Sequence, residues 1–201
     1  MQLSDFPPPA TLAARAARSL AERYHSESIL NHVIRSWLWA EGFAAVEERS
    51  DIDHELLYVS AMLHDIGIVP EFDNVHLSYE EAGGHVAVAL ATGAGWDADR
   101  GTRALEVIIR HNWPSVDPAM DVEGYLLETA TALDISGART EALPASFLDE
   151  VLAEYPRLQL AQEFGDGVTD QAARKPHTSA RRLVDGGVVG KLANHPLERS
   201  V

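Results

Sequence analysis

An apolar run, residues 60–63, leads directly into an adjacent histidine and aspartate, His64 and Asp65, and Gly67 follows two residues later. In the middle of a helix, neighbouring side chains point about 100° apart, so they rarely reach the same ligand. At the last turn they can, because the backbone leaves helical geometry there and a glycine permits the exit. The segment therefore predicts a helix that ends inside the core with two metal-ligand side chains at its C-terminus. The alternative interpretation is a solvent-exposed helix cap.

Apolar residues recur at helical spacing through most of the chain, and no segment shows the alternation of a half-buried strand. Several predicted helices open on a capping residue: Ser26, Asp53, Ser78 and Asp121. Ser78 also has Glu81 three residues later, which is the capping-box pattern. Residues 66–77 have no clear period and are expected to form a loop. The expected helices cover about residues 10–24, 26–41, 53–65, 78–92, 99–111, 121–134 and 145–155.

This pattern predicts an all-α fold, a single-domain bundle of about seven helices. Residues 1–24 are expected to form an N-terminal lead-in and a helix that packs on the core, and residues 25–160 the metal-binding helical domain. Residues 161–201 are expected to form a C-terminal tail that packs on the core or extends from it. This tail is rich in glycine and polar residues, with one short helix expected near residues 178–184.

The acidic balance of the chain restricts its partners. Its formal net charge is −15, and an acidic body repels nucleic acid and anionic membranes, so neither is expected as a partner. No apolar segment approaches the roughly 18 residues of a membrane-spanning helix. There is no cysteine, which excludes disulfides, thiolate ligands and a cysteine nucleophile. We expect a cytoplasmic protein that acts on a small-molecule substrate, and we leave the formation of a homo-oligomer open.

Histidines and aspartates recur at corresponding places in the predicted helices. His32 lies within a well-buried helix, and the pair His64-Asp65 ends the next one. His111 and Asp134 end later helices, each after an apolar run. Helices that pack antiparallel or obliquely can bring such positions to one point in the core. Imidazole and carboxylate ligands suit a divalent metal ion, most of all Zn²⁺ with Fe²⁺ or Mn²⁺ as alternatives, and leave positions open for water and substrate.

With these residues in place, the chain resembles the HD-domain superfamily of metal-dependent hydrolases over about residues 25–140. The signature of that superfamily is a histidine, an adjacent His-Asp pair and a distant aspartate on an all-α core. The resemblance implies an HD-type helical bundle and an enzyme that uses a metal-bound water. It also implies catalytic roles for Asp65 and for His111, as a pocket acid/base or orienting group. The metal ligands that it implies are His32, His64, Asp65 and Asp134.

A narrower resemblance is to the cyanamide hydratase-like branch, in which water adds to the nitrile group of cyanamide to give urea. It implies a hydratase, or hydro-lyase, for a small nitrile or related small molecule. The segments that carry it are residues 30–35, 62–67, 109–111, 131–134 and 175–178.

One histidine departs from the hydratase pattern and keeps alternatives open. His85, after two glycines, could combine with His111 into a dinuclear site, as in HD phosphodiesterases and di-iron oxygenases. We expect instead that His111 lines the pocket and that His85 binds no metal. The first alternative is an HD phosphohydrolase for a nucleotide or phosphate ester, which needs basic residues at the pocket. The others are a di-iron oxygenase and a non-catalytic binding module.

Other side chains carry weaker expectations. His195 lies in the polar tail, so we expect no part for it in the site. Trp96 and Trp113 stand near helix breaks, where either could form a pocket wall. The arginines expected to contact an anion are Arg103, Arg110 and Arg139.

Overall fold

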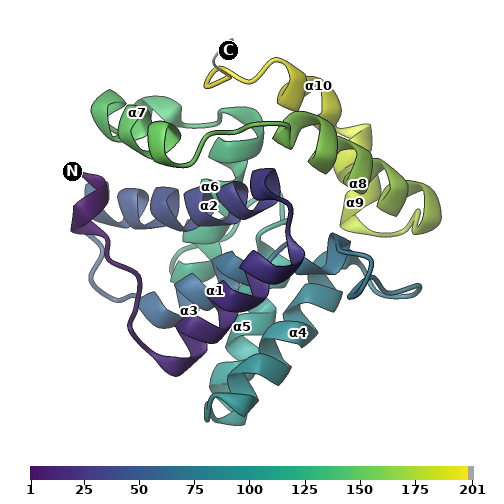
Figure 1. The fold of residues 1–201 in the computed structure, drawn as a ribbon, viewed down its shortest axis with the longest axis horizontal. Coiled ribbons are helices and arrows are strands. Elements are labelled where there is room, and N and C mark those ends of the chain that lie inside the picture. Colours follow the sequence, from purple (N-terminus) through teal and green to yellow (C-terminus); the bar gives the residue numbers. More distant parts are fainter. Residues whose placement is uncertain (199–201) are drawn as a thin grey trace.

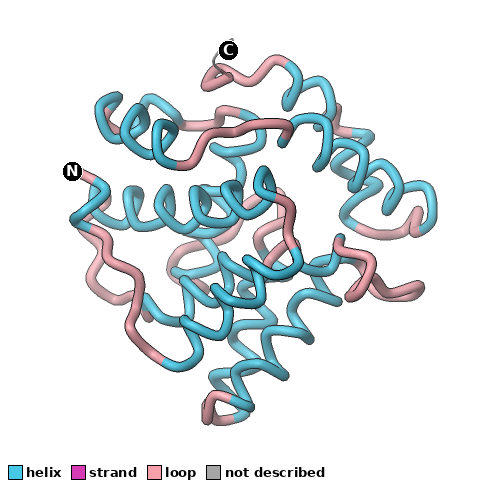
Figure 2. The backbone as a smooth tube through the Cα atoms, in the orientation of Figure 1, coloured by secondary structure: helices cyan, strands magenta, loops and turns pink. Residues whose placement is uncertain are grey.

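A computed structural model describes residues 1–198, and all regular structure in that range is helical (Figure 2). This confirms the all-α prediction. The described residues form ten α-helices and three short 3-10 helices, more than the seven or so expected. The α-helices are α1 Leu12–Tyr24, α2 Glu27–Val46, α3 His54–Leu63, α4 Tyr79–Gly93, α5 Ala98–Arg110, α6 Val122–Ser136, α7 Ala145–Glu154, α8 Leu160–Arg174, α9 Ser179–Asp185 and α10 Val188–Ala193; the 3-10 helices are η1 Leu3–Asp5, η2 Ile66–Ile68 and η3 Thr140–Ala142.

The expected capping residues start their helices. The side chains of Ser26, Asp53 and Asp121 each accept a hydrogen bond from a backbone N–H of the first turn. Ser78 and Glu81 form the reciprocal capping box at the start of α4. These boundaries follow from local chemistry, because a side-chain oxygen satisfies a donor that has no partner within the helix.

The short helix expected near residues 178–184 is confirmed as α9, whereas α8 and α10 are additional helices in or at the start of the segment expected to be a mostly irregular tail. Gly165 and Gly167 weaken the helical signal of α8, since glycine is a poor helix former. The helix nevertheless forms, because Leu160, Phe164 and Val168 lie on one face and are buried in a second apolar cluster. Packing against the rest of the molecule outweighs the low local propensity.

Helix α2 crosses the middle of the molecule and separates two groups of helices (Figure 1). Helices α1, α3, α4 and α5 lie on one side of it, and α7 to α10 lie on the other. Helix α6 contacts both α2 and α10, so its C-terminal end stands between the two groups. No helix of the described residues is long and apolar enough to cross a membrane.

Gly67 fixes the position of the turn that follows α3. A Cβ atom there would lie 2.0 Å from the carbonyl oxygen of Tyr79, at the start of α4. Gly83, one turn further along α4, also lies close to the end of α3, since its Cβ would lie 2.9 Å from the Leu63 carbonyl oxygen. The two glycines let α4 approach the end of α3 and hold His64 and Asp65 in place.

Candidate metal centre

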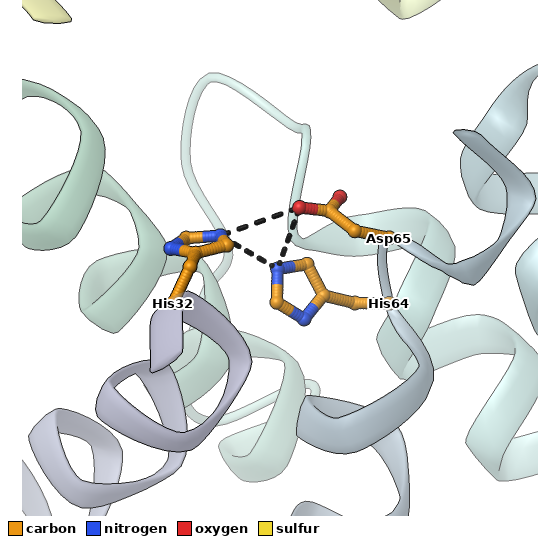
Figure 3. A group of neighbouring side chains, drawn as sticks. All are labelled: His32, His64 and Asp65. Carbon is orange, nitrogen blue, oxygen red and sulfur yellow. Dashed lines mark hydrogen bonds and ion pairs between the residues drawn. The ribbon is translucent and has the colours of Figure 1, made fainter. Parts of the chain in front are cut away.

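Three side chains from two helices meet at one buried point. His32 points inward from the second turn of α2, while His64 and Asp65 follow the last residue of α3 (Figure 3). His64 still has helical backbone angles, but Asp65 has left them, with φ −105° and ψ 4°. This change of direction lets two adjacent residues face the same point, as the sequence predicted. All three side chains are 1% exposed.

The spacing of the three residues matches the geometry of a tetrahedral zinc site. The His32 and His64 Nε2 atoms lie 3.2 Å apart, and Asp65 Oδ2 lies 3.3 Å from the first and 3.4 Å from the second (Figure 3). Ligand atoms about 2.0–2.1 Å from a tetrahedral ion are separated by about 3.3 Å. The three atoms could therefore serve as three of the four ligands of one ion.

Hydrogen bonds fix which nitrogen of each histidine faces this point. His64 Nδ1 lies 2.7 Å from the Ala61 carbonyl oxygen, which can only accept, so Nδ1 carries the proton. His32 Nδ1 likewise lies 2.7 Å from the Asp134 carboxylate. The Nε2 lone pairs of both rings then face one another and Asp65, whose two buried oxygens have no hydrogen-bond partner. A cation satisfies all of these atoms at once, so the residues fit a divalent metal ion.

Asp134 lies behind His32 and does not join this cluster. Its Oδ1 accepts hydrogen bonds from Arg35 Nε and Trp39 Nε1, each at 2.8 Å, and its Oδ2 accepts from Arg35 Nη2 and His32 Nδ1, each at 2.7 Å. Burial opposes the charge, but Arg35 and His32 hold the pKa of the carboxyl well below its usual range. Whereas the sequence predicted four side chains around one ion, the structure brings together three and uses Asp134 to orient one of them. Direct ligation by Asp134 stays a prediction.

Two of these supporting residues were not singled out as functional from sequence. Arg35 and Trp39 follow His32 by three and seven residues, so they share its face of α2. This spacing was visible in the sequence, but an arginine and a tryptophan on a buried helix are usually explained by packing. Only the tertiary contact with Asp134 reveals that they hold its carboxylate.

His111 lies beside the cluster at the end of α5. Its Nδ1 donates to the Ile108 carbonyl, its Nε2 lies 4.0 Å from Asp65 Oδ1, and its ring packs edge-on against His64 at 4.8 Å between centroids. Burial, together with the neighbouring His64, lowers the pKa of His111 to about 3. At neutral pH this imidazole is therefore uncharged, and its Nε2 can only accept a hydrogen bond. His85 is exposed on α4 and lies outside the cluster.

A cavity of about 430 Å³ opens above these residues. His32, His64, Asp65 and His111 line its floor. Its walls come from α6 and from the C-terminal helices α8, α9 and α10, so the segment expected to be a tail completes the site. The principal apolar wall residues are Trp113, Ile135, Phe164, Leu183 and Val188.

The expectation that three arginines contact an anion at the site was wrong. Arg103, Arg110 and Arg139 do not line the cavity; each pairs with acidic side chains elsewhere, namely Asp121 for the first two and Glu47 for Arg139.

Of the two tryptophans, Trp113 lines the cavity, whereas Trp96 lies under the guanidinium of Arg100. His195, which the sequence places in the polar tail, is buried, and its Nε2 donates to the Leu133 carbonyl at 2.9 Å.

Comparison with known proteins gives two results. Residues 29–142 match the model of the HD domain family. Two yeast proteins, cyanamide hydratase DDI2 and cyanamide hydratase DDI3 of Saccharomyces cerevisiae, are each 30% identical to the chain over 179 residues. The aligned segment covers 87% of this chain and 80% of each yeast protein.

Proposed function

This chain belongs to the HD domain family and is a metal-dependent hydrolase or hydratase, and on that premise we propose that it adds water to a small nitrile. The reaction converts R–C≡N and H₂O into R–C(=O)NH₂, and with cyanamide the product is urea. The observation that carries the proposal is the buried triad His32, His64 and Asp65 at the floor of a cavity, in a chain related to two cyanamide hydratases.

The triad would hold a divalent ion, for which we propose Zn²⁺. When bound, such an ion supplies Lewis acidity, which lowers the pKa of water and polarises the substrate. Asp134 and the Ala61 carbonyl keep the two histidines in the tautomer that directs Nε2 at the ion. The apolar walls exclude bulk water and strengthen the electrostatic interactions within the site.

His111 and Asp65 would direct the protons of the reaction. Both protons of the attacking water must leave its oxygen and two protons must reach the nitrile nitrogen, the first transfer giving R–C(OH)=NH and the second the amide. His111 Nε2 and Asp65 Oδ1 are two acceptors 4.0 Å apart at the cavity floor, and the Ile108 carbonyl keeps the His111 ring in place. Because the pKa of His111 is about 3, its neutral ring orients the attacking water rather than storing a proton.

Two features bear on the alternative functions. Arg182 and Lys191 line the cavity, and this favours a phosphohydrolase as the second candidate, since that reaction needs cations near the substrate. A dinuclear oxygenase gains no such support, because His85 is exposed and the described residues contain one metal-ligand cluster.

Assays of the purified protein loaded separately with Zn²⁺, Mn²⁺ and Fe²⁺ test the proposal. We expect formation of urea from cyanamide, abolished in Asp65→Ala and reduced by about 100-fold in His111→Asn with the metal retained. His85→Ala is the matched control and should keep full activity. Hydrolysis of p-nitrophenyl phosphate without hydration of any nitrile would replace this proposal with the phosphohydrolase.

A further inference from the structure

The cavity is far larger than cyanamide requires. Its volume of about 430 Å³ falls in the range of sites that hold drug-sized ligands, whereas cyanamide has only three non-hydrogen atoms. A substrate that fills it must extend from the floor past Ile135, Phe164 and Leu183 toward α9 and α10. These three side chains favour an apolar middle part of the substrate, although Thr131, Ser136 and Ser179 also line the cavity and offer hydroxyl groups.

Two cations stand at the solvent-exposed side of the cavity, whereas His32, His64 and Asp65 are buried. Arg182 of α9 and Lys191 of α10 both line the cavity and are exposed, and no carboxylate among residues 1–198 forms an ion pair with either. Most other arginines in that range are paired: Arg181, next to Arg182, binds Asp185 on the surface. Two unpaired cations at one cavity are unusual in a chain with 31 acidic and 16 basic residues.

Among residues 1–198, Glu128 of α6 is the one carboxylate that lines the cavity besides Asp65. It is half-buried and bonds to the neighbouring Thr129 hydroxyl. With a divalent ion held by the triad, the positive charges of the cavity exceed the negative ones, whereas the protein as a whole is strongly acidic. The field inside the cavity therefore favours an anionic ligand.

We infer that Arg182 and Lys191 bind an anionic group, a carboxylate or a phosphate, at the far end of a substrate whose reacting group lies over His32, His64 and Asp65. This inference rests on the proposed function only for the identity of the reacting group. It assigns the substrate to a class: an elongated small molecule with a reactive polar end, an apolar middle and an anionic end. Arg182 and Lys191 then determine specificity, and cyanamide is a minimal substrate.

Matched ligands test the inference by direct binding. 4-Carbamoylbutanoate and its neutral counterpart glutaramide share the same amide end and length and differ only in charge. Calorimetric titration of the zinc-loaded and the metal-free protein should show that the acid binds at least tenfold more tightly, because each charge-assisted hydrogen bond contributes about a factor of ten. Arg182→Gln and Lys191→Gln should each reduce the preference for the acid over the amide about tenfold. Arg182→Lys should retain most of it, and the matched control Arg181→Gln should change nothing.

Activity measurements distinguish the two sources of the anion. Hydration of 4-cyanobutanoate in preference to 4-cyanobutanamide, lost in Arg182→Gln, identifies a carboxylate. Hydration of 3-cyanopropyl phosphate in preference to 4-cyanobutanoate, likewise lost in Arg182→Gln, identifies a phosphate. Equal binding of the acid and the amide, or equal effects of Arg182→Gln and Arg181→Gln, would overturn the inference. If no nitrile reacts but binding of the acid still depends on Arg182, the proposed function fails and this inference stands.

Discussion

His64 and His111 end their helices in the same way: the Nδ1–H of each donates to the carbonyl oxygen three residues earlier, Ala61 for the first and Ile108 for the second. Both imidazoles are thereby held in the tautomer that leaves Nε2 free, and both Nε2 atoms lie at the cavity floor. The two rings contact each other edge-on. The same hydrogen bond at two helix ends therefore orients His64 as a metal ligand and, beside it, His111 as a neutral hydrogen-bond acceptor.

Metal content should be one divalent ion per chain. The described residues hold a single ligand cluster, and the exposed His85 is not part of it. We expect one equivalent in the wild type and in His85→Ala, and none in His64→Ala or Asp65→Ala, by elemental analysis of protein purified without added metal. Two equivalents in the wild type that fall to one in His85→Ala would contradict the mononuclear site.

Asp134→Asn should weaken both folding and metal binding. The substitution leaves the fully buried Arg35 without its ionic partner, which costs about 3–5 kcal/mol of unfolding free energy. It also removes the carboxylate from His32 Nδ1, and loss of such a partner weakens metal affinity by about 10–100-fold. Urea denaturation of the metal-free variant and chelator competition measure the two effects.

Trp39→Phe is the control for metal affinity, since it removes one hydrogen bond to Asp134 but leaves the carboxylate beside His32. It should cost about 1–3 kcal/mol, because the buried indole ring also loses volume, and leave metal affinity within about twofold. If Asp134→Asn weakens metal binding no more than Trp39→Phe, the carboxylate does not hold His32.

The protein should lose stability as the pH falls below 6.5, because His111 is held neutral in the folded state. Its pKa in the folded protein is about 3, against about 6.5 in the unfolded chain, so the unfolded state binds a proton first as the pH falls. The stability contributed by the neutral ring is fully present above pH 6.5 and is lost as the pH falls from 6.5 toward 3. Between pH 6.5 and 5 the loss is on the order of 2 kcal/mol.

His111→Asn removes this contribution, so the metal-free variant should lose less stability than the metal-free wild type over the same interval. Urea denaturation at pH 5.0 and 6.5 measures the change in the free energy of unfolding of each protein. His25, whose pKa burial lowers to about 4, acts in the same direction in both proteins and cancels in the comparison. Parallel pH profiles of the two proteins would show that His111 is not held neutral by the fold.

Gly67→Ala should be strongly destabilising. The new Cβ would meet the Tyr79 carbonyl oxygen at 2.0 Å, which forces α4 away from the end of α3 and displaces His64 and Asp65. We expect a loss of at least about 1–3 kcal/mol, as for other overpacked sites, together with weaker metal binding. Gly93→Ala is the matched control: a Cβ there meets nothing within 4 Å, so it should be neutral or slightly stabilising by thermal denaturation. Equal effects of the two substitutions would contradict the close approach at Gly67.

The sequence alone determined the features that rest on local chemistry. Helical periodicity identified the all-α class, capping residues such as Ser78 marked the helix starts, and Gly67 after His64-Asp65 predicted where α3 ends. The HD family signature was recognisable because three of its residues, His64, Asp65 and Asp134, stand at or near the ends of predicted helices. These features depend on neighbours a few residues apart, which a sequence displays directly.

Only the tertiary structure decided how residues that are far apart in the chain are placed relative to one another. It placed Asp134 behind His32, where Arg35 and Trp39 donate hydrogen bonds to its oxygens, outside the cluster of His32, His64 and Asp65. It ordered α8 to α10 as the walls of the cavity and brought Arg182 and Lys191 there, whereas the arginines favoured from sequence pair elsewhere. The physical reason is that burial and charge pairing depend on which surfaces meet, and a glycine-rich helix such as α8 is stable only through the apolar face that its neighbours cover.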